Sequence, residues 1–307
     1  MKKTNIKQWT VLIYANGNNE LEPEIWRSKL AAEKVGSSDN INVIMEIGRE
    51  NPQLVKIIRP HDSMPKENES WTGVRRYYIL KSKSILIKKL GNSNMADPHN
   101  LYEFIKWCIE TYPAKHYMVI LAGHGASYIA VMPDLSQNMP YMLGVQQMCK
   151  VINMILKDTG IKIDILVLDM CFMNSIEIMY ELGSKKSNCV KNVLTYIKDG
   201  PLSGLPYDKL IYTVEQNNNI SDLSNLLKNI IDNIDLNLVA IEINHAKLKK
   251  IKQDVSNVAY SYLVNKGYEN KTAYQLINNL DMKDPWYNQV LQFQNSLKKI
   301  IIHYKNL

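Results

Sequence analysis

The sequence predicts an α/β fold, in which helices cover both faces of a mostly parallel central sheet. Short apolar runs recur along the chain, as at 117–122 and 163–168, and such runs are typical of strands buried on both faces. The second run is followed by apolar residues three and four positions apart over 173–182, which is the spacing of an amphipathic helix. The alternation of these two patterns indicates parallel strands joined by crossover helices.

The predicted elements follow one another in a simple order. Strands are expected at 9–15, 42–47, 117–122, 163–168, 190–197 and 238–243, with a hairpin of 75–80 and 84–87. Helices are expected at 21–35, from 97 or 100 to 112, at 145–157, at 173–182, from 221 to 234, at 246–264, and from 284 toward 303. Asp97 or Asn100 can cap the second helix and Ser221 the fifth, because these side chains accept hydrogen bonds from N–H groups at a helix start. Irregular segments are expected at 50–71 and 126–143.

Length and composition bound the class of protein. The chain has 307 residues, of which 46% are apolar, so it can bury a large core. We expect one main α/β domain over 1–265 and a helical extension over 266–307, packed on that domain or following it. The net charge of +7 comes from scattered lysines without interleaved aromatic residues, which is typical of a solvated surface rather than a nucleic-acid groove. No nucleic-acid partner is expected.

Targeting and redox signals are sparse. The apolar run at 9–15 is too short for a signal peptide or a membrane span, so we expect no membrane association, and a protein that is either cytoplasmic or a mature secreted form. The four cysteines form no C-x-x-C pair and indicate no disulfide framework. Three of them lie in apolar patterns, as buried small hydrophobic residues do. Two histidine–aspartate clusters, at 61–62 and 97–99, have no second cluster at zinc spacing, so no metal site is predicted.

Polar side chains follow two of the apolar runs directly. His124 lies between two glycines after the run at 117–122, and Cys171 follows the run at 163–168. The carboxyl ends of neighbouring parallel strands meet at one edge of a sheet, where ligands bind. Either residue alone is more often a packing or turn residue, but together they supply a nucleophile and a general base.

The local setting of Cys171 suggests how the thiol is activated. We expect its sulfur to lie near N–H groups at the start of the following helix, whose partial positive charge favours a thiolate. The N–H groups of Gly125 and of Cys171 itself are the natural donors for an oxyanion hole.

The chain resembles the caspase-like cysteine peptidases and is more closely similar to the clostripain family. The resemblance rests on consistent order over about 240 residues. It covers segments 9–14, 19–22, 94–98, 104–107, His124-Gly125, 169–173 with Glu177 and 180–182, and the strand at 238–243. It implies a caspase-like three-layer sandwich and an endopeptidase in which His124 and Cys171 form a dyad.

The resemblance also implies cleavage after Arg or Lys. Asp169, two residues before the cysteine, matches the specificity carboxylate, which suits a basic P1 side chain. The alternative for Asp169 is a cap of the following helix. Asp199 is a second candidate for the same pocket, and Asp208 and Asp134 are fallbacks. The expected partner is a protein or peptide with a basic P1 residue, cut by a monomer.

Some residues depart from the family pattern. After Lys115 no Lys or Arg occurs until Lys150, so the loop after the histidine offers no basic self-processing site and we predict an uncleaved chain. No cofactor is expected to be required. A role for calcium is implied only by the resemblance, since some relatives depend on calcium. Asn18 stands where the family usually shows Asp, which speaks against the same dependence in this chain. Thr195-Tyr196 also replaces the usual Ser-Glu.

Two functions therefore follow from the sequence. The first is a cysteine endopeptidase that cuts after a basic residue through an acyl-enzyme on Cys171. The alternative is a catalytically silent relative that binds peptides in the same cleft. Retention of both His124 and Cys171 favours the first, whereas the altered groove residues keep the second open.

Overall fold

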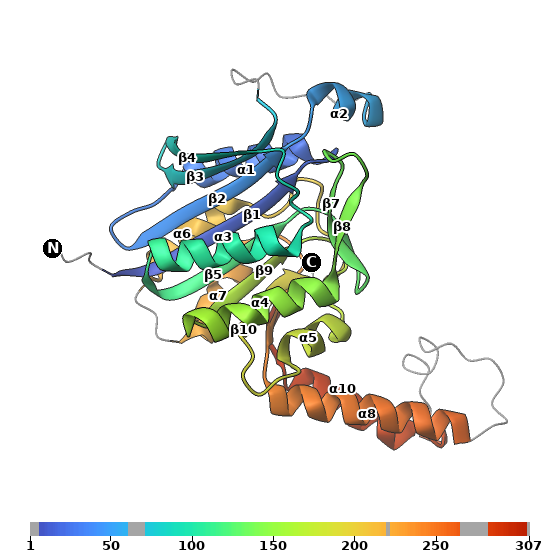
Figure 1. Ribbon diagram of the computed structural model, residues 1–307. Coiled ribbons are helices and arrows are strands. Elements are labelled where there is room, and N and C mark those ends of the chain that lie inside the picture. The colour runs from blue at the N-terminus through green and yellow to red at the C-terminus, as the bar shows by residue number, and fades with distance from the viewer. Residues whose placement is uncertain (1–5, 61–70, 219–221, 265–281, 306–307) are drawn as a thin grey trace.

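A nine-stranded sheet forms the centre of the protein (Figure 1). The computed structural model describes residues 6–60, 71–218, 222–264 and 282–305. The strand order is β12-β11-β10-β9-β5-β1-β2-β3-β4, and the five strands from β10 to β2 are parallel. The strands beyond each end of this parallel block are antiparallel to their inner neighbours. The predicted mixed α/β sheet is thus confirmed.

The parallel strands are β1 (Lys7–Gly17), β2 (Ile41–Arg49), β5 (Ala114–Ala122), β9 (Ile163–Asp169) and β10 (Val190–Tyr196). The antiparallel strands are β3 (Gly73–Leu80), β4 (Lys83–Gly91), β11 (Leu238–Glu242) and β12 (Ile301–Lys305). Every residue of β2 and β9 is buried, because helices cover both faces of these strands. This is why the central strands read as continuous apolar runs.

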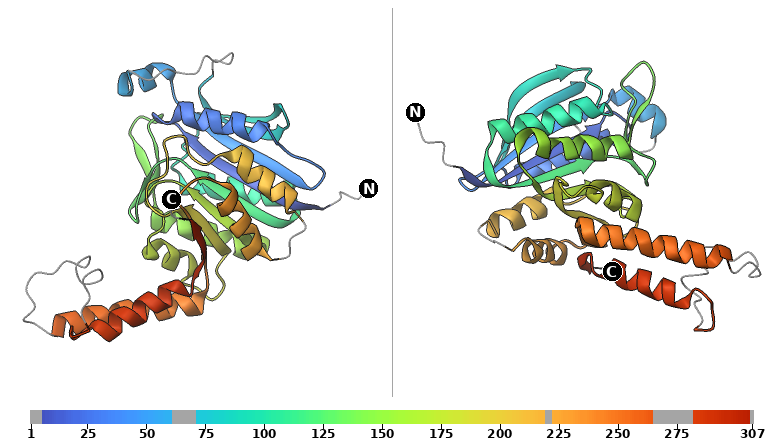
Figure 2. Two further views of the ribbon diagram at one scale, coloured as in Figure 1. Left: turned by 180° about the vertical axis from the view of Figure 1, so that it is seen from behind. Right: turned by 60° about the horizontal axis from the view of Figure 1, so that its bottom comes forward.

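Helices cover both faces of the sheet, and each face has its own apolar core. One face is covered by α1 (Glu22–Glu33), α6 (Tyr207–Gln216) and α7 (Leu223–Asn233), which lie nearer the viewer in the left panel of Figure 2. The other is covered by α3 (Pro98–Thr111), α4 (Val145–Thr159), α5 (Ile176–Gly183) and the beginning of α8 (His245–Val264). Successive residues of β1 alternate between the two cores: Val11 and Ile13 face one, Leu12 and Tyr14 the other. The result is the expected three-layer sandwich.

Two helix starts show how the local sequence acts. Asp97 accepts a hydrogen bond from the His99 N–H at 2.8 Å and caps α3, as predicted. Asp222 caps α7 by accepting from the Ser224 N–H at 2.9 Å. Ser221, the cap expected for that helix, lies outside the described residues.

Several elements were not expected. The segment 50–71 contains a helix, α2 (Pro52–Ile58), and the segment 126–143 forms most of a small antiparallel sheet of β6 (Gly125–Ala126), β7 (Ala130–Asp134) and β8 (Tyr141–Gly144). Helix α6 was also missed. Helix α2 and the small sheet are short and rich in polar residues, so their packing partners rather than their periodicity decide their structure. Helix α6, in contrast, has buried apolar residues at helical spacing, namely Tyr207, Leu210, Ile211 and Val214, so its sequence pattern could have revealed it.

The C-terminal part differs from the expected helical extension. Helices α8 and α10 (Tyr287–Lys298) lie side by side as an arm that reaches away from the sheet (Figures 1 and 2). The helix expected to run toward His303 ends at Lys298, and His303 lies in β12, which pairs with β11 at the edge of the central sheet. The predicted boundary between 265 and 266 lies outside the described residues. Among the described helices, none is long and apolar enough to span a membrane.

Candidate active site

The ends of two neighbouring strands bring His124 and Cys171 together. Strands β5 and β9 are parallel neighbours, and Ala122 at the end of β5 is in register with Asp169 at the end of β9. His124 and Cys171 each follow two residues later. Both side chains therefore emerge at the same edge of the sheet, as the two apolar runs indicated.

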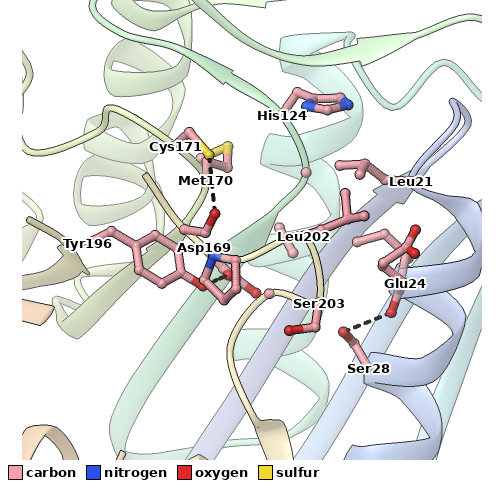
Figure 3. Close-up of a pocket in the computed structure, with 16 residues that line it drawn as sticks. Leu21, Glu24, Ser28, His124, Asp169, Met170, Cys171, Tyr196, Leu202 and Ser203 are labelled. Atoms are coloured by element: carbon pink, nitrogen blue, oxygen red, sulfur yellow. Dashed lines mark hydrogen bonds between the residues drawn. The ribbon is translucent and has the colours of Figure 1, made fainter. Parts of the chain in front are cut away.

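Both residues line one cavity of about 220 Å³. One wall comes from the beginning of α1, another from the strand ends, and a third from the loop of residues 200–204 that follows β10. In the view of Figure 3, His124 and Cys171 lie above Asp169 and Tyr196, with Glu24 and Ser28 on the α1 side. A thiol, an imidazole and a carboxylate therefore line the same cavity.

Cys171 differs from the other three cysteines in its exposure. It is partly exposed, and its thiol faces the Gly200 carbonyl oxygen at 3.9 Å. Cys108, Cys149 and Cys189 are fully buried. Burial raises the pKa of the Cys149 thiol to about 12 and that of Cys189 to about 11, so these groups are protonated at neutral pH and unreactive. Cys171 alone among the four cysteines is accessible to a substrate.

The expected helix start beside Cys171 is wrong. Residues 171–174 form a turn, Ser175 is the N-cap residue, and α5 begins only at Ile176. Phe172, directly after the cysteine, has a φ of 60°, a left-handed conformation that is rare for a bulky side chain. The cysteine lines the cavity, and four residues separate it from the start of α5. Activation of the thiol by the dipole of this helix stays a prediction.

His124 has a partner that the sequence did not reveal. Its Nε2 atom lies 2.8 Å from Oε1 of Glu20, and both side chains are partly exposed. The hydrogen bond from His124 is the main cause that lowers the pKa of the Glu20 carboxyl. Glu20 is therefore ionised at neutral pH and holds the imidazole through one nitrogen.

Gly125 touches the backbone of Cys171. A Cβ atom added at Gly125 would lie 2.3 Å from the Cys171 carbonyl oxygen, which no side chain could tolerate. The close approach brings together the two residues expected to provide oxyanion donors. It also explains the glycine after His124, since only glycine permits this contact.

Asp169 is buried at the base of the cavity and is not a helix cap. Its Oδ1 accepts from the Tyr196 hydroxyl at 2.5 Å, its Oδ2 accepts from the Tyr207 hydroxyl at 3.0 Å, and the Leu205 N–H lies 3.1 and 3.2 Å from the two oxygens. Burial raises the pKa of the Asp169 carboxyl, and these three donors offset part of the effect. Burial also raises the pKa values of both tyrosines, so they remain donors.

A glycine near Asp169 fits the loop to the carboxylate. Gly204 has a φ of +67°, and an added Cβ would lie 3.0 Å from Oδ2 of Asp169. The loop 200–204 can therefore approach the carboxylate closely only because this position is glycine.

The other predicted carboxylates lie elsewhere. Asp199 is exposed and does not line the cavity that holds Cys171. Asp208 forms an ion pair with Lys34, 2.9 Å between Oδ2 and Nζ, on the surface. Asp134 is fully buried, where it accepts from the Asn18 amide at 2.8 Å and from the Met95 N–H at 2.7 Å. Glu24, which was not predicted, lines the cavity instead.

Within the described parts of the chain, no three or more His, Cys, Asp or Glu residues are grouped so that they could hold a metal ion. Asn18 stands where the family usually shows Asp, and its side-chain amide donates a hydrogen bond to Asp134. Calcium dependence therefore stays a prediction from resemblance alone.

A comparison with protein-family profiles matches residues 32–303 to the clostripain family. The chain belongs to the clostripain family. Membership makes it a cysteine-type peptidase with a protein or peptide substrate. A comparison with curated proteins finds no match.

Solved structures of clostripain-family (C11) proteases share the fold. One is a secreted C11 cysteine protease from Bacteroides thetaiotaomicron in complex with an irreversible peptide inhibitor, with a TM-score of 0.69, 14% identity, and coverage of 97% of this chain and 84% of that chain. Another is an inactive zymogen C11 protease from Parabacteroides distasonis, with a TM-score of 0.64, 14% identity, and coverage of 98% and 84%. At such low identity the likeness extends to the three-layer fold and not to individual site residues.

Proposed function

We propose that this clostripain-family peptidase cuts peptide bonds after Arg or Lys, with His124 and Cys171 as a catalytic dyad. One observation carries the proposal. The accessible cysteine, the histidine and the buried carboxylate of Asp169 line a single cavity at the carboxyl ends of the parallel strands. A basic side chain that enters this cavity would place its carbonyl carbon near the thiol.

The chemistry follows from these groups. Sγ of Cys171, as the thiolate, attacks the carbonyl carbon and forms an S–C bond while the carbonyl electrons move to the oxygen. Collapse of this oxyanion breaks the C–N bond, and the imidazolium of His124 gives its proton to the leaving amine. Water then adds to the acyl-enzyme with His124 as base, which releases the acid and the thiol. The N–H groups of Gly125 and Cys171 are the proposed oxyanion donors.

The environment of Asp169 indicates how a basic side chain would be recognised. An ionised carboxylate has about four lone-pair positions, and Tyr196, Tyr207 and Leu205 already occupy most of them. Little capacity remains for a bidentate contact with a guanidinium group. We therefore expect Asp169 to act mainly as a fixed negative charge at the base of the cavity, which would accept both Arg and Lys.

The test compares fluorogenic peptides with Arg, Lys, citrulline or Leu at P1, under reducing conditions, with and without added calcium. We expect cleavage of the Arg and Lys peptides only, abolished in Cys171→Ala and reduced at least about a hundredfold in His124→Ala. The Asp169→Asn variant should lose the preference for Arg over citrulline, which has nearly the same shape without the charge.

Three results would overturn parts of the proposal. Equal activity of wild type and Cys171→Ala would exclude the dyad. Tight binding of Arg peptides without turnover would instead favour the silent, peptide-binding alternative. Equal rates with the Arg and citrulline peptides would leave a cysteine peptidase but remove the basic specificity.

A further inference from the structure

We propose that Glu20 is a positioning residue for His124, which makes the catalytic unit a Glu20–His124–Cys171 triad in which Nδ1 of the imidazole is the basic nitrogen. The inference deepens the dyad proposed above and rests on it. Glu20 lies before the residues that match the family profile, so the match itself assigns it no role.

The sheet explains why Glu20 reaches the histidine. Strands β1 and β5 are parallel neighbours, with Ala15 of β1 in register with Ala122 of β5. Glu20 follows β1 as His124 follows β5, so both leave the sheet at the same edge. The order β9-β5-β1 places β5 between the strands that precede Cys171 and Glu20, and the histidine therefore lies between the thiol and the carboxylate.

The turn that carries Glu20 is held firmly. The Asn19 amide donates to the Pro133 carbonyl oxygen at 2.8 Å, and Oδ1 of Asn19 accepts from the Leu21 N–H at 2.9 Å. Nη1 of Arg59 donates to the Glu20 carbonyl oxygen at 2.8 Å and to Oε2 of Glu24 at 2.8 Å. These bonds fix the backbone of Glu20, so its side chain presents the carboxylate from a defined point.

The contact also selects the tautomer of the imidazole. Glu20 is ionised at neutral pH, and an ionised carboxylate only accepts hydrogen bonds. Nε2, which lies 2.8 Å from Oε1 of Glu20, must therefore carry a proton. In the neutral ring the lone pair then resides on Nδ1, which can take the thiol proton. Once it has done so, the negative charge of Glu20 stabilises the imidazolium that balances the thiolate.

The experiment measures alkylation of Cys171 by iodoacetamide as a function of pH, in the full-length protein and with the modified cysteine identified by mass spectrometry. Alkylation needs neither peptide binding nor turnover, so it tests this inference even if the peptide specificity proposed above is wrong. In wild type we expect the alkylation rate to rise with pH, and the pH at which it rises is the reference for the variants. In Glu20→Gln we expect that onset to move upward by about 1 pH unit.

A second arm separates action through His124 from a general structural effect. In a His124→Ala background, Glu20→Gln should cause no further shift, because its effect is transmitted through the imidazole. Glu110→Gln is the matched control, because it removes the same charge from an exposed position near the end of α3. This end of α3 lies by the amino ends of the parallel strands, away from the site, so the variant should leave the alkylation profile unchanged. If peptide cleavage is observed, Glu20→Gln should lower kcat at least about tenfold and change KM little.

The outcomes are decisive in either direction. The inference is overturned if Glu20→Gln, folded by circular dichroism, has the wild-type alkylation profile, or if it shifts the profile equally with and without His124. An upward shift that requires His124 supports it, whether or not the Arg and Lys peptides are cleaved.

Discussion

Removal of one hydroxyl group should reveal how strongly the base of the cavity depends on its tyrosines. Tyr207 is completely buried, and its hydroxyl donates to Oδ2 of Asp169 at 3.0 Å. The Tyr207→Phe variant keeps the ring but leaves a buried oxygen of Asp169, which carries a negative charge in the proposed function, with one donor fewer. Hydrogen bonds to charged groups contribute about 1.5–3 kcal/mol, so the free energy of unfolding should fall by about that amount.

The assay is equilibrium unfolding in urea at neutral pH, with Tyr212→Phe as the control. Tyr212 lies on the same helix, but 55% of its surface is exposed, and loss of its hydroxyl should change the free energy of unfolding by less than about 0.5 kcal/mol. In an Asp169→Asn background the cost of Tyr207→Phe should shrink, because the acceptor is no longer charged. Equal losses for Tyr207→Phe and Tyr212→Phe would refute the view that Tyr207 stabilises a buried charge.

Three further predictions concern the same site. Ellman's reagent should modify one thiol per native chain and none in native Cys171→Ala. Unfolding in urea should make the three buried cysteines reactive as well. A second reactive thiol in the native protein would contradict the burial of Cys108, Cys149 and Cys189. Gly204→Ala should lower the free energy of unfolding by about 1 kcal/mol, because alanine rarely adopts the φ of +67° that Gly204 has. The variant should also lower kcat/KM for Arg peptides. An unchanged kcat/KM would show that the loop 200–204 does not define the cavity. Burial raises the pKa of the Asp169 carboxyl, and the carboxylate loses its charge as the pH falls through that pKa. The ratio of kcat/KM for Arg peptides to kcat/KM for citrulline peptides should therefore decline with falling pH in wild type. In Asp169→Asn the same ratio should not change with pH.

The sequence predicted the parts of the site that depend on the strands. The apolar runs before His124 and Cys171 are continuous because helices cover both faces of β5 and β9, and a parallel sheet brings the ends of such runs to one edge. Their proximity followed from that rule alone. The same rule applied to the first strand could have directed attention to Glu20, which follows the end of β1.

The missed features depend on contacts that no local pattern records. The roles of Tyr196 and Tyr207 exist only because the loop after β10 folds back over Asp169, and two tyrosines eleven residues apart carry no signal of a shared partner. The helix after Cys171 was expected too early because Met173 fits the apolar spacing of α5, although residues 171–174 form a turn. Asp199 was a second candidate taken from the resemblance, but its side chain is exposed and does not line the cavity.

The position of β12 has a consequence for the order in which the protein can form. All residues proposed for catalysis precede residue 208, yet β11 remains an edge strand until residues 301–305 pair with it. The long arm of α8 and α10 separates these two partners in the chain, so closing this pair requires a distant contact that forms slowly. During synthesis, the residues proposed for catalysis therefore leave the ribosome well before the sheet that supports them can be completed. The edge of β11 stays unpaired in that interval and is open to incorrect pairing.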